Sequence, residues 1–227
     1  VQIVKTGPND DNTTLHQLLK NPTGLSMDMM SERLSHLLPY VKFSDIKNII
    51  DVGAAHGFES INLARAFTNA KVWGFEPTPE HYNFALDNYA KQPIDIGNRI
   101  SLTNLALNDI AGQIKFYPLD ENLSRGNNTG MASKFKLMNP QVFPHELNIQ
   151  KEIVVNATTL NQWCASNNIM PDIIWMDAQG AELDILQGAV GCLSSVKAIL
   201  TEAALKPYYH GHTLKHDIDL LLQNYGF

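Results

Sequence analysis

A turn of small residues that follows an acid carries the first chemical signal in the sequence. Residues 49–57 read IIDVGAAHG, so Asp51 ends an apolar run and glycines follow at 53 and 57. Such a turn between a strand and a helix lets the backbone approach a ligand and points helix amides at it. The pattern predicts a binding turn with Asp51, Gly53, Ala54 and His56. The alternative is that Asp51 only caps a tight bend.

A second acid, Glu76, follows Asp51 by 25 residues, in the run GFEP at 74–77. A carboxylate at the end of the second strand can accept hydrogen bonds from both hydroxyls of a ribose. A dinucleotide pyrophosphate requires G-x-G-x-x-G, and an acid beside the turn would repel it, whereas Asp51 can receive the amino group of a methionine moiety. The sequence therefore favours S-adenosylmethionine over NAD, and it places Pro77 beside Glu76 in the cofactor site.

Two further acids close later apolar runs. Asp177 follows the run 173–176, and Glu202 ends the run 197–202. Because the carboxyl ends of parallel strands share one rim of a sheet, both acids are expected to face the methyl group to be transferred. Methyl transfer is a displacement at a sulfonium, so the protein has to align the acceptor, exclude water and take up a proton. We expect Asp177 to contact the acceptor hydroxyl as a base or orienting group.

Other roles stay open for these groups. Asp177 could cap the helix that follows it by accepting hydrogen bonds from free amides. Asp177 and Glu202 could share a divalent metal, although Ala203 stands where a third ligand would be expected. His212 could be the base, because imidazole titrates near neutral pH. The histidines at 210–216 lack a cysteine or acid within their segment that would complete a zinc site, so no metal is predicted.

Apolar runs alternate with amphipathic stretches, as expected of a mostly parallel sheet with helices on both faces. One helix is expected to begin near Gly57, and another near Pro79 with Thr78 as its N-cap. The apolar spacing predicts further helices at 183–193 and from 213 onward. The expected strands are residues 47–52, 71–75, 99–103, 173–176 and 197–202.

The segment 112–160 interrupts this alternation. Residues 113–117 and 152–155 are expected to form two extra strands between the third and fourth core strands, separated by a long polar loop. A loop of that length is usually functional or disordered, and a lid over the acceptor is one interpretation. Residues 1–43 are expected to form a helical lead-in to a single cofactor-binding domain at 44–227.

Four segments together resemble the FkbM-type methyltransferases, over residues 45–227. The resemblance implies a Rossmann-like class I methyltransferase fold, S-adenosylmethionine as cofactor, and O-methylation of a hydroxyl on a sugar or another small molecule. The segments are IIDVGAAHG at 49–57, GFEP at 74–77, LALNDIAG at 105–112 and WMDAQGAELDILQG at 175–188.

The resemblance also assigns residues to parts of the cofactor. It implies that Asp51 and Gly53 line the methionine end and that Glu76 holds the ribose. It places Asn108 and Asp109 beside the adenine.

Three features depart from the family pattern. Ala55 stands where the family usually has asparagine, and His56 is an unusual neighbour. Gln179 replaces the acid of the more common Asp-Val-Glu-Gly motif. The final antiparallel strand pair of the fold is not expected, because the sequence ends at Phe227.

Composition limits the classes of function. The chain has 227 residues, of which 44% are hydrophobic and 18% charged, as suits one globular domain. Its net charge of −6 would repel a phosphate backbone, so nucleic acid is not an expected partner. The two cysteines form no paired motif, and no apolar run could span a membrane. A cytoplasmic protein without membrane association is predicted, and the sequence does not indicate its oligomeric state.

These observations favour an S-adenosylmethionine-dependent methyltransferase that acts on a hydroxyl of a sugar or other small molecule. One alternative is a metal-dependent small-molecule O-methyltransferase. Another is a catalytically inactive, cofactor-binding partner subunit, which the altered Gln179 position would fit.

Overall fold

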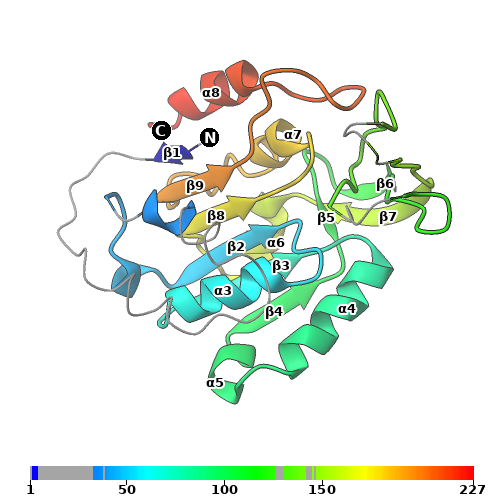
Figure 1. Ribbon diagram of the computed structural model, residues 1–227. Helices are drawn as coiled ribbons and strands as arrows, with labels where there is room; N and C mark the ends of the chain where they lie inside the picture. The colour runs from blue at the N-terminus through cyan, green and yellow to red at the C-terminus, as the bar shows by residue number, and fades with distance from the viewer. Residues whose placement is uncertain (1, 5–32, 38, 126–129, 142–144, 146) are drawn as a thin grey trace.

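Five parallel strands form the centre of the main sheet, and each comes from one of the expected apolar runs (Figure 1). The computed structural model describes residues 2–4, 33–37, 39–125, 130–141, 145 and 147–227. The strand order is β1-β9-β8-β2-β3-β4, and neighbouring strands are parallel except at β1. The parallel strands are β2 (Asn48–Val52), β3 (Lys71–Phe75), β4 (Ile100–Thr103), β8 (Ile173–Met176) and β9 (Ala198–Thr201).

The direction in which strands are added to the sheet reverses at β2. Strands β3 and β4 extend the sheet to one side, and β8 and β9 extend it to the other. In open α/β sheets, ligands bind at the carboxyl ends of the strands beside such a switch point. The Rossmann-like α/β fold is confirmed, and its topology places a site above β2, β3 and β8.

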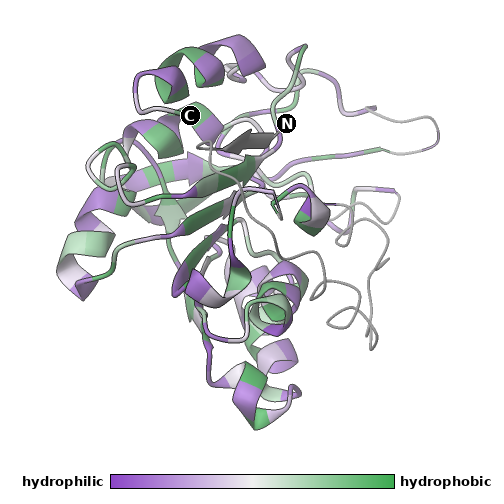
Figure 2. Cartoon of the chain, turned by 90° about the vertical axis from the view of Figure 1, so that its left-hand side faces the viewer, coloured by the Kyte–Doolittle hydropathy of each residue, from purple (hydrophilic) through white to green (hydrophobic). Residues whose placement is uncertain are grey.

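Helices cover both faces of the sheet, and each strand sends alternate side chains to the two faces. Ile49 and Ile173 belong to one hydrophobic cluster, whereas Ile50 and Ile174 belong to the other. Figure 2 shows hydrophobic colouring along the strands between the helical layers. One face carries η1 (Phe43–Asp45), α3 (Phe58–Ala66), α4 (Pro79–Ala90) and α5 (Ile94–Gly97); the other carries α6 (Leu160–Asn167), α7 (Glu182–Gln187) and α8 (Lys215–Gln223).

The lead-in is helical at residues 33–35, as expected, and differs from the expected form at residues 2–4. Strand β1 (Gln2–Val4) pairs antiparallel with β9 and forms the edge of the main sheet. Three residues are too few to show the alternation that reveals a strand in a sequence. Most of the expected lead-in helix, at residues 5–32, lies outside the described residues. Leu34 and Leu37 are fully buried in the core beside β2 and β8.

The interrupting segment supplies two strands of a separate three-stranded sheet, which has the order β5-β7-β6. The two predicted extra strands are confirmed as β6 (Gly112–Phe116) and β7 (Ile153–Thr158), which pair antiparallel. The third, β5 (Ala106–Leu107), was not expected and pairs parallel with β7. The long connection between β6 and β7 reaches the other side of the site, because Leu137 forms a bridge with Tyr209. Residues 126–129 of this connection lie outside the described residues.

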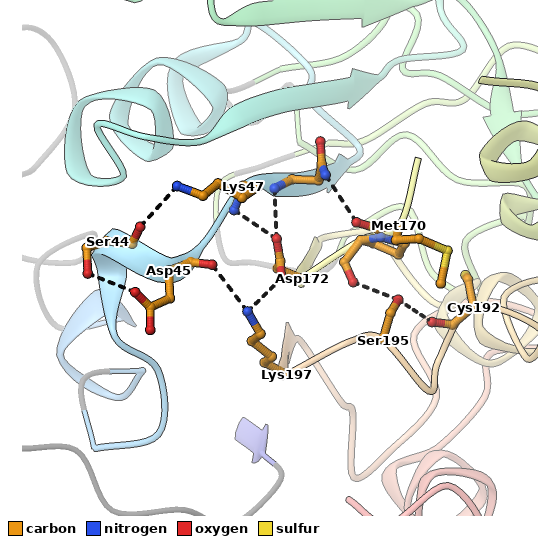
Figure 3. Close-up of polar contacts among 10 residues, drawn as sticks. Ser44, Asp45, Lys47, Met170, Asp172, Cys192, Ser195 and Lys197 are labelled. Atoms are coloured by element: carbon orange, nitrogen blue, oxygen red, sulfur yellow. Dashed lines mark hydrogen bonds and ion pairs between the residues drawn. The ribbon is translucent and has the colours of Figure 1, made fainter. Parts of the chain in front are cut away.

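At the opposite end of the strands from the site, Asp172 joins β2, β8 and β9 (Figure 3). Its Oδ2 accepts hydrogen bonds from the backbone N–H groups of Lys47, at 2.8 Å, and Asn48, at 3.0 Å. Its Oδ1 pairs with Lys197 Nζ at 2.8 Å, and the same ammonium donates to the Asp45 carbonyl. One carboxylate just before β8 thus satisfies groups at the beginnings of the two neighbouring strands, β2 and β9.

Asp172→Ala is expected to lower the free energy of unfolding by about 2 kcal/mol, because it leaves two backbone donors and a lysine without their acceptor. Asp172→Asn should cost less, since one acceptor oxygen is retained. Chemical denaturation measures both values. Cofactor affinity should not change, because Asp172 lies at the far end of the strands. Equal stability of wild type and Asp172→Ala would show that this contact contributes nothing.

Candidate active site

A cavity of about 300 Å³ opens at the carboxyl ends of β2, β3 and β8. This volume is at the lower end of the range for small-molecule sites. Leu105, Leu107 and Phe116 give one side of it an apolar wall. Six residues that the sequence singles out are among those that line it: Asp51, Gly53, His56, Glu76, Pro77 and Asp177.

The turn after β2 is held against β8 by its first glycine. Gly53 has φ +81°, and a Cβ at this position would overlap the carbonyl oxygen of Asp177. The amides of Gly53 and Ala54 both donate to the Phe75 carbonyl at 3.0 Å. Asp51 therefore does not cap this turn. Ala54 is fully buried and lies outside the cavity lining, whereas Ala55 takes part in it.

Asp51 is the most deeply buried acid of the site, with 1% of its surface exposed. Its Oδ2 accepts a hydrogen bond from the Ser60 hydroxyl on α3. Burial raises the pKa of Asp51 to about 7, and the Ser60 hydrogen bond offsets part of this effect. Within the described residues, no lysine, arginine or histidine forms an ion pair with Asp51. An acid held in this way is suited to a cationic group of a ligand.

Glu76 is buried at the end of β3 and connects the turn after β2 with the N-terminus of α4. Its Oε2 accepts the Ala55 amide at 2.9 Å, and its Oε1 accepts the amide and hydroxyl of Thr78 at 2.8 and 2.5 Å. Burial raises the pKa of Glu76, while the hydrogen bonds from Thr78 and Ala55 act in the opposite direction. Thr78 is the N-cap of α4, as expected, but its side chain donates to Glu76 and makes no capping hydrogen bond.

Two histidines form an aromatic wall beside Glu76. The rings of His56 and His81 lie 4.8 Å apart, and the ring of Phe84 lies 4.6 Å from His56. Burial lowers the pKa of both histidines, so both rings are neutral at neutral pH. His56 does not cap α3, whose N-cap is Gly57. Neutral rings at this position offer a ligand a flat surface rather than charge.

Asp177 follows β8 and faces the same cavity. Its Oδ1 accepts a hydrogen bond from Gln179 Nε2 at 2.6 Å, and within the described residues its Oδ2 accepts none. Burial raises the pKa of Asp177 to about 6, with a further contribution from Glu202. Asp177 does not cap α7. The amides of Ala178 and Gly180 donate instead to Glu182 Oε1, at 3.2 and 3.1 Å.

The other two candidate catalytic residues lie outside the cavity lining. Glu202 is exposed, and its Oε1 lies 3.5 Å from Arg33 Nη2. His212 accepts the Tyr208 amide at Nδ1, at 3.2 Å, and burial lowers its pKa. In a neutral ring this leaves the proton on Nε2, which makes His212 a hydrogen-bond donor toward other groups. The arrangement favours Asp177 as the base.

Asn108 and Asp109 also lie outside the cavity lining. Asn108 Oδ1 accepts a hydrogen bond from Lys134 Nζ at 2.6 Å, and Lys134 forms an ion pair with Asp184. Lys134 itself lines the cavity. Asn108 therefore contributes to the site by holding a lysine that comes from the connection between β6 and β7.

Within the described ranges, no three histidine, cysteine or acidic side chains converge as metal ligands would. In the same part of the chain, no helix combines the length and apolarity needed to cross a bilayer.

The model of the methyltransferase FkbM domain matches residues 51–227, which is most of the chain and includes the whole set of acids around the cavity. This protein belongs to the FkbM methyltransferase family. The resemblance seen in the sequence is therefore confirmed.

Individual relatives of this FkbM-family chain are distant. The 2-O-methyltransferase NoeI of Sinorhizobium fredii (strain NBRC 101917 / NGR234) is 28% identical over 182 residues, which cover 76% of this chain and 70% of that protein. Methyltransferase FkbM from Methylobacillus flagellatus KT is 18% identical, with a TM-score of 0.49, over 93% of this chain and 51% of that chain. This chain thus spans about half the length of that structure. An O-methyltransferase from Bacillus cereus in complex with SAH is 12% identical, with a TM-score of 0.45, over 95% of this chain and 78% of that chain.

Several contacts of this FkbM-family site were not predicted from the sequence. Ser60 lies on α3 one helical turn beyond the glycine turn, so an amphipathic reading of that helix could have suggested its inward direction. His81 lies on α4, and its proximity to Glu76 depends on how that helix packs against the sheet. Lys134 and Tyr209 come from irregular segments, where neither periodicity nor a motif indicates direction.

Proposed function

We propose that this protein transfers the methyl group of S-adenosylmethionine to a hydroxyl of a sugar or another small molecule. The observation that carries the proposal is the placement of three acids around one cavity. Asp51, Glu76 and Asp177 stand at the carboxyl ends of three adjacent strands, with a glycine turn between the first and the last.

The residues present fit the cofactor. Asp51 is a buried acid without a cationic partner among the described residues, and it would hold the amino group of the methionine moiety. Glu76 Oε2 has one hydrogen bond from the chain and can accept another, from a ribose hydroxyl. The apolar wall at Leu105 and Leu107, with the neutral His56, would receive the adenine. The bound cofactor supplies an activated methyl group on a sulfonium.

The remaining chemistry falls to the chain itself. Asp177 Oδ2 is free to accept the proton of an acceptor hydroxyl, and the raised pKa of Asp177, about 6, suits a base that works near neutral pH. The connection between β6 and β7 contributes Lys134 to the cavity and would help to exclude water. These groups would orient the acceptor and remove its proton.

A small hydroxylated acceptor is the class we propose. The name of the S. fredii relative records O-methylation at a 2-position. The negative net charge and the acids at the cavity disfavour a nucleic-acid backbone as acceptor. The acceptor would lie beside Asp177 and near Lys134 of the β6–β7 connection, which both line the cavity.

The test is transfer of a labelled methyl group. The protein is incubated with methyl-labelled S-adenosylmethionine and a panel of mono- and oligosaccharides, and label in the sugar is measured together with S-adenosylhomocysteine. Asp172→Asn is the matched control, because it removes a partly buried charge far from the cavity. Dependence on magnesium would support the metal-dependent alternative. Binding of S-adenosylhomocysteine without transfer to any acceptor would favour an inactive subunit, and calorimetric binding of NAD alone would overturn the cofactor assignment.

Glu76→Ala is expected to weaken binding of S-adenosylhomocysteine by roughly 10- to 100-fold, because a charge-assisted contact to the ribose is lost. It also frees the amides of Ala55 and Thr78, so part of the effect is loosening of the turn. Glu76→Gln keeps the shape and one acceptor and should cost less. Calorimetric titration measures both affinities. Wild-type affinity in Glu76→Ala would place the ribose elsewhere.

A further inference from the structure

A chain of hydrogen bonds leads from a buried tyrosine to the Asp177 carboxylate. The Tyr209 hydroxyl donates to Gln179 Oε1 at 2.9 Å, and Gln179 Nε2 donates to Asp177 Oδ1 at 2.6 Å. Tyr209 is 2% exposed and follows β9, whereas Gln179 and Asp177 follow β8. These two hydrogen bonds therefore connect the segment after β9 with the segment after β8, which are distant in sequence.

The glutamine has little freedom in this arrangement. Its carbonyl accepts the Ser133 hydroxyl at 2.7 Å, and its backbone has φ +49°, which glutamine rarely adopts. Because the Tyr209 hydroxyl donates to the amide oxygen, the amide nitrogen has to face Asp177. Backbone and side chain are thus both fixed, and every donor in the chain points toward the carboxylate.

We propose that Gln179 is a positioning residue, which holds Asp177 by Oδ1 so that Oδ2 faces the cavity in the ionised form that accepts the acceptor's proton. The catalytic meaning of this role rests on the proposed function. The hydrogen-bond chain itself does not depend on it.

The electrostatic surroundings explain why such a donor is needed. Among the residues that the structure describes, the acids Glu202 and Glu59 disfavour the ionised form of Asp177, and the cation Arg33 acts in the opposite direction. The amide of Gln179 opposes the two acids without adding charge. The charged or titratable groups that face Asp177 are Arg33, Asp51, Glu59, Glu182, Glu202 and Tyr209.

Gln179→Glu and Tyr209→Phe test this role. The first keeps the shape but replaces the donor by another acid, and the second removes only the hydroxyl that orients the amide. Aspartate labelled with ¹³C at the carboxyl carbon reports the titration of Asp177 by NMR, and Asp177→Asn identifies its signal. The wild-type midpoint is expected near 6. Gln179→Glu should raise the midpoint by about one pH unit or more, and Tyr209→Phe by less.

With the acceptor found by label transfer, the acidic limb of kcat should move upward to the same extent, so that kcat falls at pH 6 more than at pH 8. Binding of S-adenosylhomocysteine should stay within a few-fold of wild type, and thermal melting checks that both variants fold. An unchanged NMR midpoint in both variants would overturn the proposal. Shifted midpoints in a protein that transfers no methyl group would leave the positioning role standing and reject the proposed function.

Discussion

Replacing Asp51 by asparagine is expected to weaken cofactor binding by at least about 100-fold and, at the same time, to stabilise the ligand-free protein above neutral pH. The loss of affinity follows from removing the buried partner of the cofactor's amino group. The gain in stability follows because the ligand-free fold holds Asp51 in an environment that disfavours its charge. Calorimetry with S-adenosylhomocysteine and thermal unfolding measure the two effects.

The two effects of Asp51→Asn can be separated by pH. The pKa of Asp51 is about 7 in the folded protein, above the ordinary aspartate value of 3.8 that applies to the unfolded chain, so between these two pH values the folded state binds the proton more tightly. Stability from Asp51 is therefore complete below about pH 4 and is lost as the pH rises through 7. The Tm advantage of Asp51→Asn should be small at pH 4 and largest near pH 8. Asp45→Asn, at an exposed position, is the matched control. A Tm below wild type at pH 8 would contradict the prediction.

Asp177→Asn is expected to lower turnover by about 10²- to 10⁴-fold, the usual contribution of a positioned base. Affinity for S-adenosylhomocysteine should change by no more than a few-fold, because Asp177 faces the acceptor side. Stability should not fall, since Glu182 and not Asp177 satisfies the amides before α7. Steady-state kinetics at saturating cofactor, with label transfer as the assay, measures the effect.

Glu202→Gln provides the comparison for Asp177→Asn, because it also removes one carboxylate at the same rim. Glu202 is exposed and pairs with Arg33, so its loss should alter turnover by no more than a few-fold. Wild-type turnover in Asp177→Asn would show that the base lies elsewhere. The comparison with Glu202→Gln and with a variant of His212 would then identify it.

The five core strands were predictable because each is an apolar run bounded by polar residues or glycine, and their ends agree with the sequence to within one residue. Periodicity also found α3, α4, α7 and α8. It missed β1 and β5, which have three and two residues, because a pattern needs several repeats to be seen. It missed α6, where the Thr159 N-cap and the Asn168 C-cap, rather than a strong apolar face, define the helix.

The acids of the site were predictable for a different reason. Asp51 lies near the end of β2, Glu76 and Asp177 directly follow β3 and β8, and a parallel sheet brings the ends of its strands to one rim. The side chains that contact these acids depend on tertiary packing, which no local sequence pattern predicts. Tyr209 reaches Asp177 through Gln179, across 32 residues of sequence, and only the packing of the loop after β9 decides that contact.

The β5-β7-β6 sheet and the connection within it are separate from the main sheet, so the region that would select the acceptor can differ between proteins that share the same methyl-donor site. Asp51 and Glu76, which we propose hold the methyl donor, lie at the main sheet, whereas Lys134 comes from the connection between β6 and β7 of the small sheet. Exchanging residues 112–152 for the same segment of another FkbM-type protein should therefore transplant acceptor choice while leaving donor use intact. In a fold organised in this way, replacing one inserted segment can change which acceptor is methylated.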